Sequence, residues 1–79
     1  MGFRFREAVI ESIERLKPHP RVGPLFRGSI SGLRSWPVRG FAAIRIYYIH
    51  VQDCLRVVRI LHSKRHVRRI LKHDKESEG

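Results

Sequence analysis

The sequence predicts an α+β domain in which an N-terminal helix packs on a small antiparallel sheet. One observation is a helical repeat of apolar residues at the start of the chain. A second is a pair of β-branched and aromatic runs that are separated by two residues. The third is the length of the chain, because 79 residues can bury only one small hydrophobic core. We expect a single domain over residues 1–72 and a disordered tail over 73–79.

Residues 3–16 are expected to form the helix. Its apolar residues recur at the spacing of one helix face, and charged residues occupy the opposite side. Pro18 and Pro20 then end the helix. We interpret the apolar stripe as part of the core. Its members are Phe5, Val9, Ile13 and Leu16.

The middle of the chain is expected to be a loop that leads into a broken or edge strand. Residues 17–32 are rich in proline and glycine. Residues 33–39 are suited to a short strand, but Pro37 lacks a backbone donor and restricts that strand to an edge of the sheet. Gly40 then turns the chain.

Residues 41–51 and 54–62 are expected to pair as an antiparallel hairpin around Gln52 and Asp53. A loop of only these two residues places Arg45 and His62 close together on one face. A bulge or a longer loop would shift one strand and move half of the side chains to the other face. In the simple register one face holds Ile44, Ile46, Tyr48, Val57 and Leu61, and the other Arg45, Tyr47, Arg56, Val58, Ile60 and His62.

The charge of the chain is strongly one-sided. Seventeen Lys and Arg residues against seven Asp and Glu residues give a formal net charge of +10. No acidic residue lies between Glu14 and Asp53, and none between Cys54 and His73. A field of one sign attracts polyanions and acidic protein partners. The alternative interpretation is a charged surface that serves only solubility, although such surfaces usually mix their signs.

Several classes of site are not predicted. A single cysteine, Cys54, excludes an internal disulfide and argues against a cysteine-based metal site. The five histidines do not have a metal-binding spacing, and phosphate-loop and nucleophile-elbow motifs are absent, so we expect no metal or cofactor. No apolar run is long enough to cross a membrane, and the first residues do not form a signal peptide. We expect a cytoplasmic protein.

Residues after the loop have the order and spacing of a known family. Tyr48 is followed at family-like spacing by Arg59, His62 and Arg65. On these residues the chain resembles the RelE/ParE toxins of type II toxin–antitoxin, or plasmid stabilisation, modules over about residues 3–72. The matching segments are Leu33-Arg34-Ser35-Trp36-Pro37-Val38, Gly40-Phe41, Ile46-Tyr47-Tyr48 and Val58-Arg59-Ile60-Leu61-His62-Ser63-Lys64-Arg65.

The resemblance implies one departure from the family. Its members begin with a β-strand and a first helix, and residues 3–16 are similar to the second helix. The chain is then expected to be a short member, the product of a later start codon or a decayed remnant. A missing strand would expose a sheet edge, which two copies could cover by forming a homodimer.

The family also implies two kinds of activity. ParE-like members bind DNA gyrase, whereas RelE-like members cut messenger RNA on the ribosome. In the second case the resemblance places Arg45, His62 and Arg65 as candidate catalytic residues, with the arginines stabilising phosphoryl charge and the histidine transferring protons. The alternative is that these side chains are structural or solvated.

The basic segment at the end of the chain is the expected partner-binding surface. An acidic antitoxin segment that folds on binding would suit it. We rank a ParE-like non-enzymatic toxin first, a RelE-like ribonuclease second and an inactive family member third. The expected partner-binding residues are Arg56, Arg59, Lys64, Arg65, Arg68 and Arg69.

Overall fold

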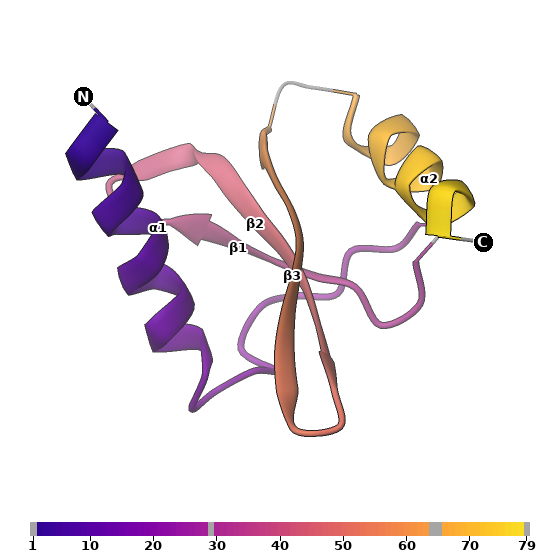
Figure 1. Ribbon diagram of the computed structural model, residues 1–79, viewed down its shortest axis with the longest axis horizontal. Coiled ribbons are helices and arrows are strands. Elements are labelled where there is room, and N and C mark those ends of the chain that lie inside the picture. The colour runs from indigo at the N-terminus through magenta and orange to yellow at the C-terminus, as the bar shows by residue number, and fades with distance from the viewer. Residues whose placement is uncertain (1, 29, 64–65, 79) are drawn as a thin grey trace.

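The computed structural model describes the backbone of residues 2–28, 30–63 and 66–78, with side chains for 4–28, 30–63 and 66–72. The strands form one antiparallel sheet in the order β1-β2-β3. Helices α1 and α2 lie on opposite sides of this sheet (Figure 1). The predicted α+β class is confirmed. The elements are α1 (Gly2–Leu16), β1 (Arg34–Val38), β2 (Phe41–Val51), β3 (Cys54–His62) and α2 (Val67–Glu78).

Each face of the sheet has its own hydrophobic core. On the α1 face, Ile46 and Tyr48 of β2 are completely buried together with Leu16 of α1. On the α2 face, Tyr47 of β2 packs in a cluster with Leu71 of α2. Successive side chains of a strand point to opposite faces, so β2 supplies residues to both cores.

The apolar stripe of α1 packs on the sheet as predicted. Leu16 is buried, and Val9 and Ile13 are half-buried against the same core. Phe5 meets Phe41 of β2 edge to face, with the ring centroids 5.2 Å apart. The interpretation of this stripe as core is confirmed.

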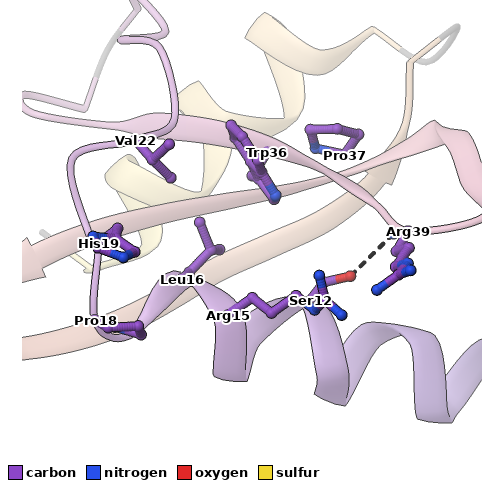
Figure 2. Close-up of a pocket in the computed structure, with 9 residues that line it drawn as sticks. All are labelled: Ser12, Arg15, Leu16, Pro18, His19, Val22, Trp36, Pro37 and Arg39. Atoms are coloured by element: carbon purple, nitrogen blue, oxygen red, sulfur yellow. Dashed lines mark hydrogen bonds between the residues drawn. The ribbon is translucent and has the colours of Figure 1, made fainter.

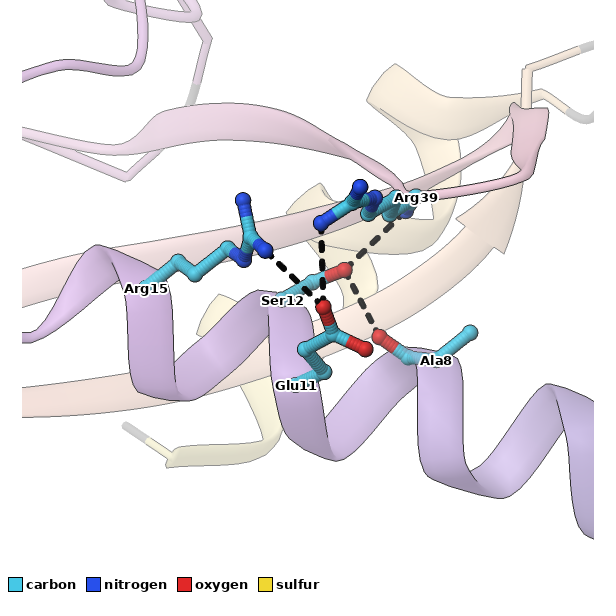
Figure 3. Close-up of polar contacts among 5 residues, drawn as sticks. All are labelled: Ala8, Glu11, Ser12, Arg15 and Arg39. Carbon is cyan, nitrogen blue, oxygen red and sulfur yellow. Dashed lines mark hydrogen bonds and ion pairs between the residues drawn. The ribbon is translucent and has the colours of Figure 1, made fainter.

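Ser12 is a polar residue within the buried face of α1. Its side chain is buried, and its hydroxyl donates to the Ala8 carbonyl oxygen at 2.7 Å (Figure 3). The same hydroxyl accepts a hydrogen bond from the Arg39 backbone N–H at 3.0 Å. Arg39 directly follows β1, so one hydroxyl ties the middle of α1 to the end of that strand.

The loop between α1 and β1 is held by the hydroxyl of Tyr48. This hydroxyl donates to the Pro20 carbonyl oxygen at 2.9 Å and accepts from the Gly23 N–H at 3.1 Å. A Cβ atom at position 23 would lie only 2.5 Å from the Tyr48 hydroxyl oxygen and 2.6 Å from the Ser35 carbonyl oxygen. The close packing of the loop on β1 and β2 therefore requires glycine at this position.

Strand β1 lies at an edge of the sheet, as Pro37 predicted. Its outer side is covered at the start, where the Ser35 N–H donates to the Pro24 carbonyl oxygen at 3.1 Å. Two residues farther along, the backbone nitrogen of Pro37 faces the same way and carries no hydrogen. The edge therefore offers no regular row of donors to a further strand.

The hairpin of β2 and β3 has the predicted bounds. Gln52 and Asp53 form its loop with φ angles of 52° and 61°. Positive φ at both positions is the conformation of a type I′ turn, whose twist matches that of the flanking strands.

A β-bulge in β3 changes the predicted faces. Tyr47 pairs with Arg59 and Tyr48 with Val57, so Val58 is an extra residue. From this point the alternation of β3 is shifted by one residue. The placement of Leu61 with the α1-face residues is therefore wrong. Ile60 packs in the α1-face core and Leu61 in the α2-face core.

Helix α2 follows β3 and packs on the α2 face of the sheet. It extends from Val67 to Glu78 and so includes most of residues 73–79, for which we expected a disordered tail. Val67 and Leu71, one turn apart, are buried against the α2 face. Gly79 lies outside the described residues.

We expect Ser12→Ala to lower the free energy of unfolding by about 1–3 kcal/mol, because the Arg39 N–H loses its acceptor in a partly buried position. Urea denaturation followed by circular dichroism measures this change. Ser31→Ala, at an exposed position, is the control and should change it by less than about 0.5 kcal/mol. Equal effects of the two substitutions would contradict the role assigned to Ser12.

Candidate functional site

An open pocket of about 650 Å³ lies between the α2 face of the sheet and the first turn of α2. Strands β1 and β2 supply one wall, Ser63 and His66 between β3 and α2 together with the start of α2 another, and the loop before β1 a third. We call it the Arg45 pocket. It is lined by Phe26, Ser35, Arg45, Tyr47, Ser63, His66, Val67, Arg68 and Arg69.

Arg45 is positioned by the neighbouring strand. Its Nε and Nη2 atoms donate to the Ser35 hydroxyl oxygen at 3.3 Å and 3.0 Å. Ser35 is buried, so its hydroxyl is a fixed acceptor. A neutral hydroxyl does not cancel the charge of the guanidinium, and other N–H groups of Arg45 are still available to an anion. Arginine in this state is suited to bidentate contact with a carboxylate or a phosphate.

Aromatic rings form the apolar part of the pocket. Tyr47 is 2% exposed and meets Phe26 edge to face, with the ring centroids 5.2 Å apart. The guanidinium carbon of Arg68 lies 5.0 Å from the centroid of the Phe26 ring, and Arg68 Nη1 donates to the Arg27 carbonyl oxygen. The ring contact and this hydrogen bond hold Arg68 beside the pocket.

Burial raises the pKa of Tyr47, and the nearby charge of Arg45 opposes this effect more weakly. The phenol therefore stays protonated and neutral near pH 7, where ordinary tyrosines are already neutral. In this site Tyr47 can donate a hydrogen bond but cannot serve as an anionic base.

The first turn of α2 adds further positive potential. Its N-terminal N–H groups precede the first helical hydrogen bond, which runs from Ile70 to the His66 carbonyl oxygen at 3.1 Å. Arg68 and Arg69 lie in this turn, which has no acidic residue. Cations at a helix N-terminus are unfavourable, because the helix dipole is positive there. A bound anion would offset that repulsion.

Acidic side chains are absent from the described lining of the Arg45 pocket. Glu11 and Glu14 instead form ion pairs on α1, with Arg15, Lys17 and Arg39. The carboxylates of Glu11 and Glu14 thus lie on the α1 side of the sheet, away from the Arg45 pocket. The arginines of this pocket form no ion pair with a described carboxylate. An anionic group can therefore bind to them without first breaking such a pair.

The structure separates two of the three candidate catalytic residues, Arg45 and His62. Arg45 pairs with Leu61 and lies on the α2 face, whereas His62 pairs with Ile44, whose side chain packs in the α1-face core. Directly paired residues share a face, so Arg45 and His62 lie on opposite faces of the sheet. Their predicted proximity is wrong, and the cause is the bulge at Val58. Arg65 lies outside the described residues.

The predicted partner-binding residues fall largely on one face. Arg56 and Arg59 pair with Ile49 and Tyr47, two residues whose side chains pack on the α2 face. Arg68 and Arg69 line the Arg45 pocket. Lys64, like Arg65, lies outside the described residues.

Six lining residues were not predicted as site residues, and Tyr47, Ser35 and His66 are among them. Tyr47 lies two residues after Arg45 on one strand, so the period of the strand could have identified it. Ser35 needs the register between β1 and β2, which the sequence does not display. His66 immediately precedes α2, a position that depends on where the helix begins.

Membrane-spanning helices and metal-binding clusters are both absent from the described residues. No helix there is long and apolar enough to cross a membrane. No group of three histidine, cysteine, aspartate or glutamate side chains in the same part of the chain is arranged to hold a metal ion.

We expect the raised pKa of Tyr47 to make stability depend on alkaline pH. The folded state keeps the phenolic proton at a pH where the unfolded chain loses it. The resulting stabilisation is complete below about pH 10, the unfolded value, and is lost as the pH rises through the folded pKa. Urea unfolding across this range should show a steeper loss in the wild type than in Tyr47→Phe. Parallel curves would contradict this cause, since all other groups titrate in both proteins.

Comparison of the chain with protein-family models, with curated proteins and with solved structures finds no match. The RelE/ParE resemblance therefore remains a prediction from the sequence. The structural observation that bears on function is the Arg45 pocket with its basic lining.

Proposed function

We propose that this protein is the toxin of a type II toxin–antitoxin module and resembles the ParE-like branch of the RelE/ParE family. In this proposal it acts in the bacterial cytoplasm without catalysis, by binding a macromolecular target such as DNA gyrase, and an acidic antitoxin neutralises it. The observation that carries the proposal is the Arg45 pocket, in which Arg45, Arg68 and Arg69 converge with no described carboxylate in the lining.

The charge distribution supports an acidic partner. Arg56 and Arg59 lie on the same face of the sheet as the pocket and extend its basic surface along β3. Complementary charge speeds association and orients the encounter. An acidic segment that lies along this face would engage the pocket and the strand together, as expected of an antitoxin.

Binding is favoured over catalysis by the positions of the candidate catalytic groups. General acid–base catalysis needs the proton donor and the charge-stabilising group within hydrogen-bonding reach of one reacting phosphate. Arg45 and His62 are separated by the sheet and cannot meet this requirement. Attraction between charges declines slowly with distance and does not need that geometry.

A specific observation keeps the RelE-like ribonuclease as the second candidate. The pocket that holds Arg45 and Tyr47 is also lined by His66, an imidazole that the sequence resemblance did not select. An imidazole beside a phosphate-binding arginine is a possible proton-transfer arrangement. In that case His66 rather than His62 would be the acid–base group.

Controlled expression in bacteria tests the proposal. We expect the wild type to slow growth and change plasmid supercoiling, and Arg45→Ala combined with Arg68→Ala to abolish both effects. Arg4→Ala combined with Arg6→Ala removes the same charge from exposed positions on α1 and should leave both effects intact. Ribosome-dependent cleavage of messenger RNA with unchanged supercoiling would put the ribonuclease first. No effect of the wild type would indicate an inactive family member.

The proposal includes a homodimer formed through the outer edge of β3. This strand ends the sheet, and no described strand pairs with its outer side. Arg56 and Arg59 lie on this edge strand, so two paired copies would bring like charges together, an arrangement that opposes pairing.

We therefore expect salt to strengthen self-association by screening these charges. Sedimentation at high micromolar concentration should show more dimer as salt is added. Arg56→Ala should raise the dimer fraction at low salt, and Arg4→Ala should not. A monomer at every salt concentration would contradict the proposed pairing.

A further inference from the structure

A second cavity, of about 630 Å³, lies on the α1 face of the protein, away from the Arg45 pocket. It is formed by the last turns of α1, the loop that follows and strand β1, and we call it the Trp36 cavity. Figure 2 shows the Trp36 side chain across the cavity from α1. The lining residues are Ser12, Arg15, Leu16, Pro18, His19, Val22, Trp36, Pro37 and Arg39.

The apolar part of the cavity comes from three different elements. Leu16 of α1, Val22 of the loop and Trp36 of β1 all contribute to the lining. Leu16 is buried, whereas Val22 is 49% exposed. A cavity lined mostly by apolar side chains with a few polar groups is typical of a binding site.

The walls of the cavity are fixed to one another. Ser12 holds the end of β1 to α1 through its hydrogen bond with Arg39. The loop that carries Val22 is held on both sides by the Tyr48 hydroxyl, through Pro20 and Gly23. The cavity is therefore largely formed before a ligand binds, which lowers the entropic cost of binding.

The adjoining edge of β1 does not favour an added strand. Ser35 already donates outward to Pro24, and Pro37 has no N–H to donate. A peptide that approached this edge would find no regular ladder of hydrogen bonds. Recognition here depends on a side chain that enters the cavity.

Positive charge surrounds the entrance. Arg15 and Arg39 both contact the single carboxylate of Glu11, each at 3.1 Å (Figure 3). One carboxylate cannot neutralise two guanidinium groups, so this cluster keeps a net positive charge. Both arginines are more than half exposed, with side-chain exposures of 63% and 61%. An acidic residue beside an inserted apolar side chain would meet this charge.

We propose that the Trp36 cavity is a docking site for an acidic peptide segment of a partner protein, which inserts one large apolar side chain. The apolar lining accepts that side chain, and Arg15 and Arg39 attract the carboxylates that flank it. This inference goes beyond the proposed toxin function and does not depend on it, because the cavity and the Arg45 pocket share no lining residue.

A displayed library of random peptides without tryptophan tests the proposal. Trp36 is the only tryptophan of the chain, so its fluorescence reports directly on the cavity. We expect the selected peptides to share one large apolar residue next to Asp or Glu and to change this fluorescence in a saturable way. Replacing the apolar residue by alanine should weaken binding at least about tenfold.

Two matched substitutions locate the site. Val22→Asp places a charge in the lining, and Leu25→Asp places the same charge at an exposed aliphatic residue of the same loop that does not line the cavity. We expect Val22→Asp to weaken binding of a selected peptide at least about tenfold and Leu25→Asp less than about threefold. Cooperative urea unfolding of both variants checks that they are folded.

Arg15→Ala, at an exposed position, provides a second test with Arg4→Ala as its control. Only the first should weaken peptide binding, by several-fold, and added salt should reduce this difference. Arg45→Ala should leave peptide binding unchanged, which separates this site from the proposed toxin function. Peptides without a common apolar residue, equal losses in Val22→Asp and Leu25→Asp, or failure to select any peptide would overturn the proposal.

Discussion

Burial of strand β2 on both of its faces is the constraint on which the rest of the structure depends. Its side chains pack alternately against α1 and α2, as Ile46 and Tyr47 illustrate. A strand that is covered on both sides leaves little room for a charged residue. Arg45 is accommodated because the buried hydroxyl of Ser35 on the neighbouring strand accepts its hydrogen bonds.

The same arrangement places the ion-paired carboxylates of Glu11 and Glu14 on the opposite side of the sheet from the Arg45 pocket. Helix α1 carries Glu11 and Glu14 with their cationic partners, and its side of the sheet contains local ion pairs. On the other side, Arg45 meets Arg68 and Arg69 at the start of α2. Exposed ion pairs contribute little to stability. The ion pairs of Glu11 and Glu14 are therefore relevant here mainly because they occupy these two carboxylates. Both residues lie on α1, on the other side of the sheet from the Arg45 pocket.

Much of the fold could be predicted from local sequence signals. The helical stripe of α1, the edge position of β1 and the bounds of the β2–β3 hairpin all follow from spacing, from Pro37 and from the pair Gln52 and Asp53. These features depend on residues close together in the chain. Whether a segment forms a helix or a strand could therefore be predicted where residues close together in the chain determine it.

The candidate site was less accessible to sequence reasoning. The bulge at Val58 inserts one residue into the pairing of β3, and no proline or glycine marks it. That single insertion separates Arg45 from His62, which a regular register would have brought together. Ser35 entered the site only through the register of β1 on β2. The sequence identified the charge of this surface, but the grouping of its side chains depends on contacts between distant segments.

The Tyr48 hydroxyl has a consequence for how this protein can diversify. Both of its hydrogen bonds go to backbone atoms of the loop, the Pro20 carbonyl oxygen and the Gly23 N–H. The loop is therefore anchored without using the side chains of His19 or Val22. Evolution can replace those two side chains, and so alter which molecules the Trp36 cavity admits, while the loop keeps its place. Gly23 has no such freedom, because any side chain there would collide with the tyrosine that holds the loop.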